Sequence, residues 1–194
     1  MEKAMTYFLD FDRVLFDTDS YIASLPDEPG CAPFKEELRD VIAAGRDETL
    51  TGSGKRIAAW EKVSEAIRSG ALQFAPGALA RFVYPDVPEF LRAAGNEAII
   101  ISYGEKGRQR VKIENALMNI PRLTVLYVGT ESKASFFSKW PGYNGGEALL
   151  VDDRIAELEE LSRVFPSIKL YEMRRDGKEG DGRWPIIHSL NDLP

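Results

Sequence analysis

Five short apolar segments along the chain predict buried β-strands. Within each segment apolar side chains follow one another with little alternation, which is typical of parallel strands covered on both faces. The segments lie at residues 5–9, 98–101, 123–128, 148–151 and 168–171. Patterns with helical spacing lie between them, at residues 87–94, 107–118, 133–140 and 155–165. This alternation predicts an α/β fold built on a doubly wound parallel sheet.

The stretch between the first two predicted strands interrupts this alternation. It holds no convincing strand, and its amphipathic helical patterns lie at residues 33–44 and 55–69, on either side of a polar loop at 45–54. An insertion directly after the first strand is expected to lie over the carboxyl edge of the sheet, where open α/β sheets bind ligands. We therefore predict two parts: a core of residues 1–17 and 85–194, and a small helical cap of residues 18–84.

Composition and charge narrow the classes of function. The net charge of −6 over 194 residues argues against broad electrostatic binding to nucleic acid or to an anionic membrane. Cys31 is the single cysteine, which excludes an intrachain disulfide and favours a reducing compartment such as the cytoplasm. His188 is the single histidine, so a histidine-centred triad or a histidine-rich zinc site is a poor explanation. The sequence has no signal-peptide pattern and no run of membrane-spanning length, so we expect no membrane contact.

Two aspartates, Asp10 and Asp12, end the first predicted strand. Carboxylates this close repel one another and lose hydration near the interior, which is costly unless a cation offsets their charge. Mg²⁺ suits that role because it takes carboxylate, carbonyl and water oxygens. Side chains two positions apart on a strand face the same way, so the pair predicts a metal-assisted nucleophile and proton-transfer site.

Polar side chains also mark the ends of later strands at the same predicted edge. Ser102 follows the second strand, Asp152 and Asp153 follow the fourth, and Lys133 begins the helix that precedes the fourth. Each signal alone has an ordinary explanation, such as a helix cap, a turn or a solvent-facing lysine. Together they place four carboxylates, a hydroxyl and an ammonium group at one edge, a combination that suits phosphoryl transfer.

These groups divide the steps of phosphoryl transfer between them. Asp10 would attack phosphorus and form an aspartyl-phosphate. Asp12 would protonate the leaving oxygen and then activate water for hydrolysis. Mg²⁺ held by Asp10, the Asp12 carbonyl and Asp153 would offset the repulsion between carboxylate and phosphate. Ser102 and Lys133 would bind phosphate oxygens.

The order of these groups resembles the haloacid dehalogenase (HAD) superfamily. The four motifs of that family match residues 10–15 (Asp-Phe-Asp-Arg-Val-Leu), Ile101-Ser102, Lys133 and Val151-Asp152-Asp153, in order and over nearly the whole chain. The resemblance implies a Rossmann-like core, a helical C1-type cap and a Mg²⁺ cofactor. An aspartate at position 12 is similar to the phosphatase and phosphotransferase members rather than to the dehalogenases.

The resemblance also implies a role for each motif residue. It makes Asp10 the nucleophile and Asp12 the general acid/base, and it assigns phosphate binding to Ser102 and Lys133. In the metal site Asp153 is expected to bind directly, and Asp152 directly or through water. Many relatives carry glycine where this chain has Arg13. Contact with substrate anion and contact with a cap acid are open alternatives for this arginine, and we favour solvated packing.

Several neighbouring groups receive structural interpretations. Lys106 and Lys139 compete with Lys133 for the phosphate-binding role, but Lys106 follows Ser102 too closely to begin the later helix, and Lys139 lies on a different helical face from Lys133.

Residues 52–56 (Gly-Ser-Gly-Lys-Arg) lack the preceding strand and first glycine of a nucleotide loop and are interpreted as part of the cap. The aromatic side chains assigned to core packing are Trp60, Phe74, Phe82 and Tyr84. The acids assigned to a solvated helix face are Glu157, Glu159 and Glu160.

The sequence therefore predicts a Mg²⁺-dependent phosphatase whose partner is a small phosphorylated metabolite. A phosphotransferase such as a phosphomutase is the second hypothesis, because it keeps both Asp10 and Asp12. The third hypothesis is a catalytically idle fold that binds a phosphate ligand or a protein, and the complete set of site residues argues against it. A phosphatase of nucleic-acid ends is disfavoured by the acidic composition. Substrate identity and oligomeric state are not determined by the sequence.

Overall fold

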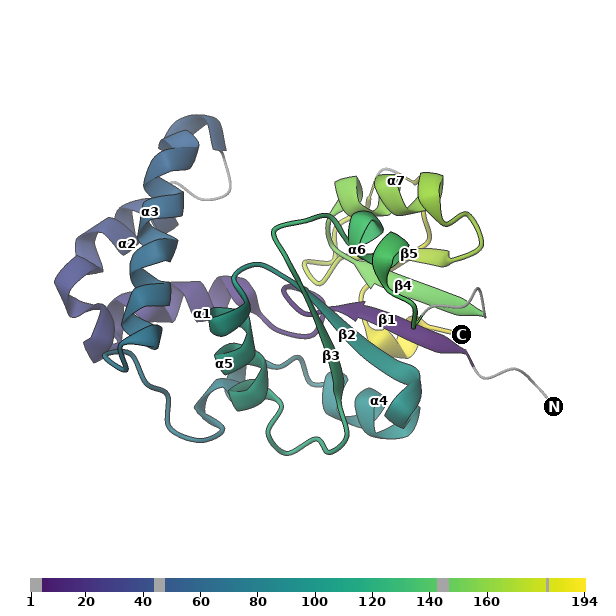
Figure 1. The fold of residues 1–194 in the computed structure, drawn as a ribbon, viewed down its shortest axis with the longest axis horizontal. Helices are drawn as coiled ribbons and strands as arrows, with labels where there is room; N and C mark the ends of the chain where they lie inside the picture. The colour runs from purple at the N-terminus through teal and green to yellow at the C-terminus, as the bar shows by residue number, and fades with distance from the viewer. Residues whose placement is uncertain (1–4, 44–47, 143–146, 181) are drawn as a thin grey trace.

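A six-stranded parallel sheet forms the centre of the protein (Figure 1). The computed structural model describes residues 5–43, 48–142, 147–180 and 182–194. The strand order is β3-β2-β1-β4-β5-β6. The strands are β1 (Thr6–Asp10), β2 (Ala98–Tyr103), β3 (Thr124–Gly129), β4 (Ala148–Asp152), β5 (Lys169–Met173) and β6 (Ile186–Ile187). The predicted α/β fold is confirmed, and only the two-residue β6 lacks a counterpart among the predicted strands.

Helices cover both faces of this sheet (Figure 1). Helices α4 (Val87–Ala94) and α5 (Lys106–Ala116) lie on one face, and α6 (Lys133–Lys139) and α7 (Ile155–Val164) lie on the other. Since side chains alternate along a strand, Phe8 of β1 belongs to the apolar core under α6 and α7, whereas Leu9 belongs to the core under α4 and α5. In the described part of the chain no helix is long and apolar enough to cross a bilayer.

Residues 18–84, between β1 and α4, are mostly helical where the structure describes them. They contain α1 (Thr18–Ser24), α2 (Lys35–Ala43) and α3 (Glu48–Arg68), together with the 3₁₀ turns Leu25–Asp27, Pro29–Phe34 and Ala78–Phe82. In Figure 1 these helices lie beyond the carboxyl end of β1, away from the N-terminus. This is the edge at which the sequence predicts the functional side chains.

Three details of this segment differ from the sequence prediction. Helix α1 has only seven residues and begins where the Asp17 side chain accepts a hydrogen bond from the Ser20 N–H, so it is too short to give a periodic pattern. Helix α2 begins two residues later than predicted, because Pro29–Phe34 form 3₁₀ turns. The predicted loop is wrong for residues 48–54, which belong to α3, while residues 44–47 lie outside the described residues. A glycine costs a helix only about 1 kcal/mol, which neighbouring favourable residues offset.

The chain leaves and re-enters the sheet through two linkers that pair with one another. The N–H of Asp17 donates to the Phe82 carbonyl at 2.7 Å, and the N–H of Tyr84 donates to the Leu15 carbonyl at 3.1 Å. Between them Phe16 and Val83 form an isolated antiparallel bridge. The two crossings therefore lie side by side, next to the loop that carries Asp12.

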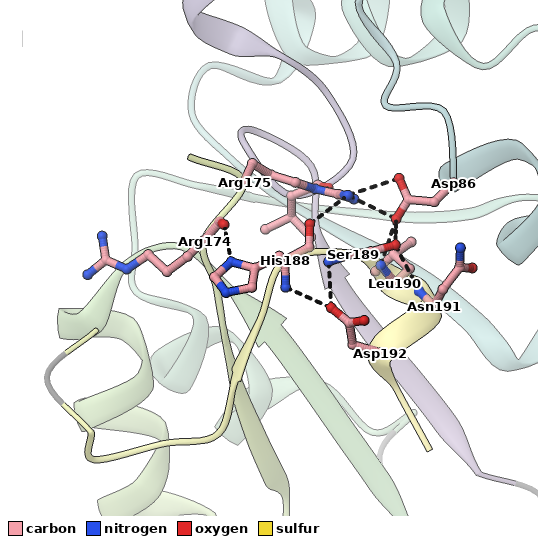
Figure 2. A network of polar contacts seen from close by, with 9 residues as sticks. Asp86, Arg174, Arg175, His188, Ser189, Leu190, Asn191 and Asp192 are labelled. Carbon is pink, nitrogen blue, oxygen red and sulfur yellow. Dashed lines mark hydrogen bonds and ion pairs between the residues drawn. The ribbon is translucent and has the colours of Figure 1, made fainter. Parts of the chain in front are cut away.

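A polar network ties these linkers to the C-terminal segment (Figure 2). Arg175, which follows β5, donates to the carbonyl of Val14 at 2.7 and 3.1 Å and to the Asp86 carboxylate at 2.9 Å. Asp86 also accepts from the Ser189 hydroxyl at 2.9 Å and from the Leu190 N–H at 2.6 Å. The neighbouring His188 is exposed, as expected for a surface residue. The network thus holds the loop after β1 against the C-terminal segment.

Candidate active site

A cavity of about 470 Å³ opens at the carboxyl edge of the sheet, between the sheet and the helical segment. Its walls come from loops after β1, β2 and β4 and from helices α1, α3 and α5. The lining residues are Asp10, Asp12, Arg13, Thr18, Tyr21, Ile22, Trp60, Tyr103, Gly104, Arg108, Gln109, Lys112, Asp153 and Arg154. Both predicted aspartates of the first strand therefore reach one cavity, together with one of the later acidic pair.

Lys133 joins two of the predicted acidic groups. Its Nζ lies 2.5 Å from Asp10 Oδ1 and also donates to Asp152 Oδ2. The lysine side chain is 1% exposed, and it reaches this position because it begins α6 directly beside the carboxyl ends of β1 and β4. The two ion pairs raise the pKa of Lys133 above its ordinary value even though burial opposes them. A buried ammonium thus lies behind the acids, outside the residues that line the cavity.

Asp10 lies in an environment rich in negative charge. Burial raises the pKa of Asp10 well above its ordinary value, and Lys133 offsets this only in part. The charges of Asp152, Asp153 and Asp12 raise the pKa further. Lys133 therefore offsets the effects that raise the Asp10 pKa only in part.

Three carboxylates at this point fit a divalent cation. Asp10, Asp152 and Asp153 each offer one oxygen, and these oxygens lie within 4.8 Å of one another. Oxygen donors of this kind suit a hard ion such as Mg²⁺. The Asp12 carboxylate is not part of this cluster, and a contribution from its backbone carbonyl stays a prediction. Which acid binds an ion directly stays a prediction.

Asp12 has a separate set of partners, none of which the sequence indicates. Its Oδ1 accepts from Lys112 Nζ at 2.5 Å and from the Thr18 hydroxyl at 2.5 Å, and its Oδ2 accepts from Gln109 Nε2 at 2.9 Å. Burial raises the pKa of Asp12, but the charge of Lys112 and these hydrogen bonds outweigh it, so the pKa lies below its ordinary value. Asp10 and Asp12 are thus separated by one residue, yet the pKa of Asp10 is raised and that of Asp12 is lowered.

Lys112 itself is buried under aromatic rings. Its Nζ lies 5.2 Å from the ring centre of Phe11, 5.5 Å from that of Phe16 and 5.8 Å from that of Tyr21. Ring faces attract a cation, and the attraction grows as water is removed. Burial lowers the pKa of Lys112, and Asp12 offsets this only in part. The rings and Asp12 together hold the ammonium at the cavity wall.

The buried hydroxyl of Ser102 makes no hydrogen bond with the described residues. Ser102 is 1% exposed, and within the described ranges its Oγ has no hydrogen-bond partner. The register of β1 and β2 pairs Asp10 with Ile101, so Ser102 is the next residue along the edge. A buried hydroxyl without a partner costs about 1–3 kcal/mol. Such a group is available to a ligand that reaches it.

Comparisons with known structures identify the fold of the sheet and its helices. No model of a known protein family and no curated protein sequence matches the chain. A solved haloacid dehalogenase-like hydrolase from Burkholderia xenovorans LB400 is similar, with a TM-score of 0.64, 20% identity, and coverage of 98% of this chain and 95% of the other. The chain has the HAD-like fold.

Two further structures with the HAD-like fold align over almost the full length. One is a dehalogenase with an intermediate complex, with a TM-score of 0.62, 17% identity, and coverage of 100% of this chain and 97% of the other. The other is the HAD-hydrolase YfnB from Bacillus subtilis bound to magnesium, with a TM-score of 0.58, 14% identity, and coverage of 99% and 97%. At these identities the likeness concerns the fold.

Within this fold the three candidate lysines have different surroundings. Lys133 lies among the acids, whereas Lys139 is exposed and forms an ion pair with Glu131. The Lys106 Nζ lies 6.0 Å from the ring centre of Tyr127, on the outer part of β3. Of the three, the geometry brings Lys133 to the carboxylate cluster.

Arg13 differs from the favoured interpretation of solvated packing, which is wrong. Its guanidinium forms an ion pair with Asp19 of α1 at 2.8 Å, and its side chain is 22% exposed. The alternative of contact with a cap acid is the one observed. Its backbone φ of +62° lies in the left-handed region, which favours glycine.

Glu157 also departs from the sequence prediction. The expected solvated face is wrong for this residue, because its side chain is 6% exposed and accepts a hydrogen bond from the Lys133 N–H at 3.0 Å. It also forms an ion pair with Arg154 at 3.2 Å. Glu157 therefore links the start of α6 to α7 and supports the position of Lys133. Glu159 pairs with Arg183 and Glu160 accepts from Ser132.

Proposed function

We propose that this protein is a Mg²⁺-dependent phosphomonoester hydrolase that acts on a small phosphorylated metabolite through an aspartyl-phosphate. The observation that carries the proposal is the separation of the two first-strand aspartates. Asp10 lies with Lys133 and the acidic cluster, whereas Asp12 is held by Lys112, Thr18 and Gln109. Two carboxylates placed in different environments suit two different roles.

Asp10 is assigned as the nucleophile. One Oδ attacks phosphorus, a new P–O bond forms, and the bond from phosphorus to the leaving alcohol oxygen breaks. Lys133 and Ser102 neutralise and bind the phosphate oxygens as charge develops on them. The raised pKa of Asp10 disfavours its carboxylate form, and a divalent cation bound by Asp10, Asp152 and Asp153 would restore that form and shield the incoming phosphate.

Asp12 is assigned as the proton carrier. In the first step it gives a proton to the leaving alcohol oxygen, and in the second it takes a proton from water as that water attacks the aspartyl-phosphate. The second step breaks the bond from phosphorus to Asp10 and releases inorganic phosphate. Its lowered pKa keeps Asp12 ionised at neutral pH in the free enzyme, so it takes up the proton it later donates as the substrate binds, because a phosphate dianion beside it raises the Asp12 pKa.

The comparisons support the same class of reaction. Several structures with this fold are described as hydrolases, one is bound to magnesium and another is described as a phosphatase from Clostridium difficile. Because one is a dehalogenase, the fold alone does not choose between carbon–halogen and phosphate-ester bonds. The aspartate at position 12 is the reason for proposing phosphate esters. We also propose the division into a core of residues 1–17 and 85–194 and a cap of residues 18–84, which the pairing of Phe16 with Val83 supports.

The test is release of phosphate from 4-nitrophenyl phosphate with and without Mg²⁺. We expect hydrolysis that needs Mg²⁺ and falls at least about 1000-fold in Asp10→Asn, because the amide cannot form the acyl-phosphate. The matched control is Asp40→Asn, an exposed aspartate of α2 that should keep full activity. Equal activity in Asp10→Asn, or none in the wild type across a broad panel of phosphate esters, contradicts the proposal.

The same experiment separates hydrolase from phosphotransferase. Transfer to an acceptor other than water would leave a labelled phosphoryl group on an organic product, whereas hydrolysis releases inorganic phosphate. We expect inorganic phosphate to account for all of the label.

A further inference from the structure

Arg108 of α5 occupies the outer wall of the cavity. Its guanidinium carbon lies 5.3 Å from the ring centre of Trp60 in α3, and its Nη1 donates to the Trp60 carbonyl at 3.4 Å. Both residues line the cavity. Cation–π attraction to an indole ring holds a guanidinium while its other N–H groups can still donate hydrogen bonds. Arg108 is thus held in place by the helical segment that also covers the cavity.

Arg108 has no ion pair with a described carboxylate and only the more distant charge of Glu105, unlike the other cations around the cavity. The others have carboxylate partners, which are Asp19 for Arg13, Asp12 for Lys112 and Glu157 for Arg154. Arg108 forms no ion pair with any carboxylate whose side chain the structure describes. The neighbouring acid Glu105 instead caps α5, where it accepts from the backbone N–H groups of Gly107 and Arg108. A half-buried cation without an anion is a favourable place for one to bind.

Arg108 also lies close to the reacting end of the cavity. A methyl group at Gly104, two residues after Ser102, would lie 3.6 Å from Arg108 Nη2. The next residue of α5, Gln109, donates to Asp12. The guanidinium is therefore between the loop that follows Ser102 and the ring of Trp60. A leaving group that extends from the phosphate past Asp12 toward the helical segment would meet it.

We propose that Arg108 recognises a second anionic group, a carboxylate or a phosphate, on the alcohol part of the substrate. Trp60 covers the short carbon chain between the two anions. This inference rests on the proposed function, because it names the class of phosphomonoester that the same cavity takes. A guanidinium matches either oxyanion with two parallel hydrogen bonds, and a cavity of about 470 Å³ suits a small metabolite.

The experiment compares substrates that differ only in the tail. Propyl phosphate has a neutral tail, 3-phosphonooxypropanoate a carboxylate tail and propane-1,3-diyl bisphosphate a phosphate tail, and the five-carbon homologues test reach. We expect the wild-type kcat/KM to be at least about tenfold higher for one anionic tail than for the neutral tail. The two anionic arms identify which oxyanion is preferred.

Two variants assign any preference to Arg108. The ratio of anionic to neutral kcat/KM should fall to about one in Arg108→Gln and be partly kept in Arg108→Lys, which has the charge without the two-pronged geometry. Arg110→Gln is the matched control, because Arg110 is exposed on the same helix and pairs with Glu114. It should keep the wild-type ratio. A wild-type ratio near one, or an unchanged ratio in Arg108→Gln, overturns the inference.

Binding measurements separate this inference from the proposed function. The affinity of Asp10→Asn for propyl phosphate and for 3-phosphonooxypropanoate or the bisphosphate is measured by calorimetry, with and without Arg108→Gln. These values need no turnover. A tenfold preference that Arg108→Gln removes supports the subsite even if the wild type hydrolyses no ester, a result that contradicts only the hydrolase. Equal affinities overturn the subsite even if hydrolysis is observed.

Discussion

Asp10 and Asp12 show how two identical side chains acquire different properties at one cavity. Burial and the charges of neighbouring acids raise the pKa of Asp10, and Lys133 offsets this only in part. Burial opposes the ionisation of Asp12, but the charge of Lys112 and three hydrogen bonds outweigh it, so the pKa of Asp12 is lowered. Position in the sequence is not the cause, because only one residue separates the two aspartates. The difference comes from their neighbours, which are acids around Asp10 and hydrogen-bond donors around Asp12.

At the residue scale, removal of Lys112 should leave Asp12 as an unpaired, partly buried charge. We expect Lys112→Met to lower the free energy of unfolding by about 3 kcal/mol, because a broken ion pair leaves one partner uncompensated. The double variant with Asp12→Asn should be more stable than Lys112→Met alone. Urea unfolding of both single variants and the double variant measures this coupling. Additive effects of the two changes contradict the pairing.

Ser102 gives a second prediction at this scale. Because its hydroxyl has no partner among the described residues, Ser102→Ala should leave the unfolding free energy unchanged or slightly higher. The same change should lower kcat/KM by about tenfold or more if the hydroxyl binds phosphate. Ser138→Ala is the comparison, since the Ser138 hydroxyl donates to the Ala134 carbonyl at 2.9 Å and should show the opposite pattern. Loss of stability without loss of activity in Ser102→Ala contradicts the assignment.

At the element scale, α5 supplies more of the cavity than its sequence suggests. It contributes Arg108, Gln109 and Lys112, and two of these residues hydrogen-bond with Asp12. The helix is polar along most of its length, so its inward face has no apolar stripe to mark it. Its site residues could not be predicted from periodicity for this reason. In contrast, α4 has a clear apolar stripe and its predicted bounds coincide with the observed Val87–Ala94.

The linkers and the C-terminal segment give a pH-dependent prediction at this scale. Burial opposes the ionisation of Asp86, but Arg175, the Leu190 N–H and the Ser189 hydroxyl outweigh it, so the pKa of Asp86 is lowered. A group whose pKa is lowered on folding stabilises the protein fully above its ordinary pKa, about 4, and loses that contribution as the pH falls through the lower folded value. We therefore expect Asp86→Asn to reduce the unfolding free energy most at neutral pH.

The measurement is urea unfolding of wild type and Asp86→Asn between pH 3 and pH 7. The difference between them should shrink below about pH 4 as the wild-type carboxylate is protonated. Asp40→Asn, at an exposed position, should show little difference at any pH. A constant difference for Asp86→Asn over the whole range would show that its charge is not the cause.

At the scale of the whole molecule, the acidic cluster couples stability to cation binding. A ligand that binds only the folded state adds about 2.7 kcal/mol at 100 times its Kd, and each kcal/mol raises the unfolding midpoint by about 2–4 °C for a protein of this size. We expect Mg²⁺ to raise the midpoint of the wild type by about 5 °C or more. Asp153→Asn should lose this gain, because one of the three carboxylates that would hold the ion is gone.

Thermal unfolding with Mg²⁺, and with the same ionic strength of sodium chloride, checks this prediction. Asp40→Asn serves again as the control and should keep the full gain. An equal gain in Asp153→Asn contradicts the predicted cluster of Asp10, Asp152 and Asp153. Because the readout is stability, the result does not depend on finding a substrate.

The sequence by itself determined the sheet and the edge at which the site lies. Continuous apolar runs require burial on both faces, and parallel strands bring their carboxyl ends to one edge, so Asp10, Ser102 and Asp152 lie at the same edge in any such fold. The boundaries were less certain, since β2 continues two residues past its apolar run to Tyr103 through hydrogen bonds with β3.

Only the tertiary structure decided the partners of these groups. Lys112 lies 100 positions from Asp12, and Arg108 lies 48 positions from Trp60, so their contacts depend on how α5 is rotated and how α1 and α3 pack against it. Arg13 likewise reaches Asp19 only because the helical segment begins beside it. Local propensity and spacing carry no information about such contacts between elements. The chain thus encodes its acidic edge locally, while the charge balance of the cavity arises from packing.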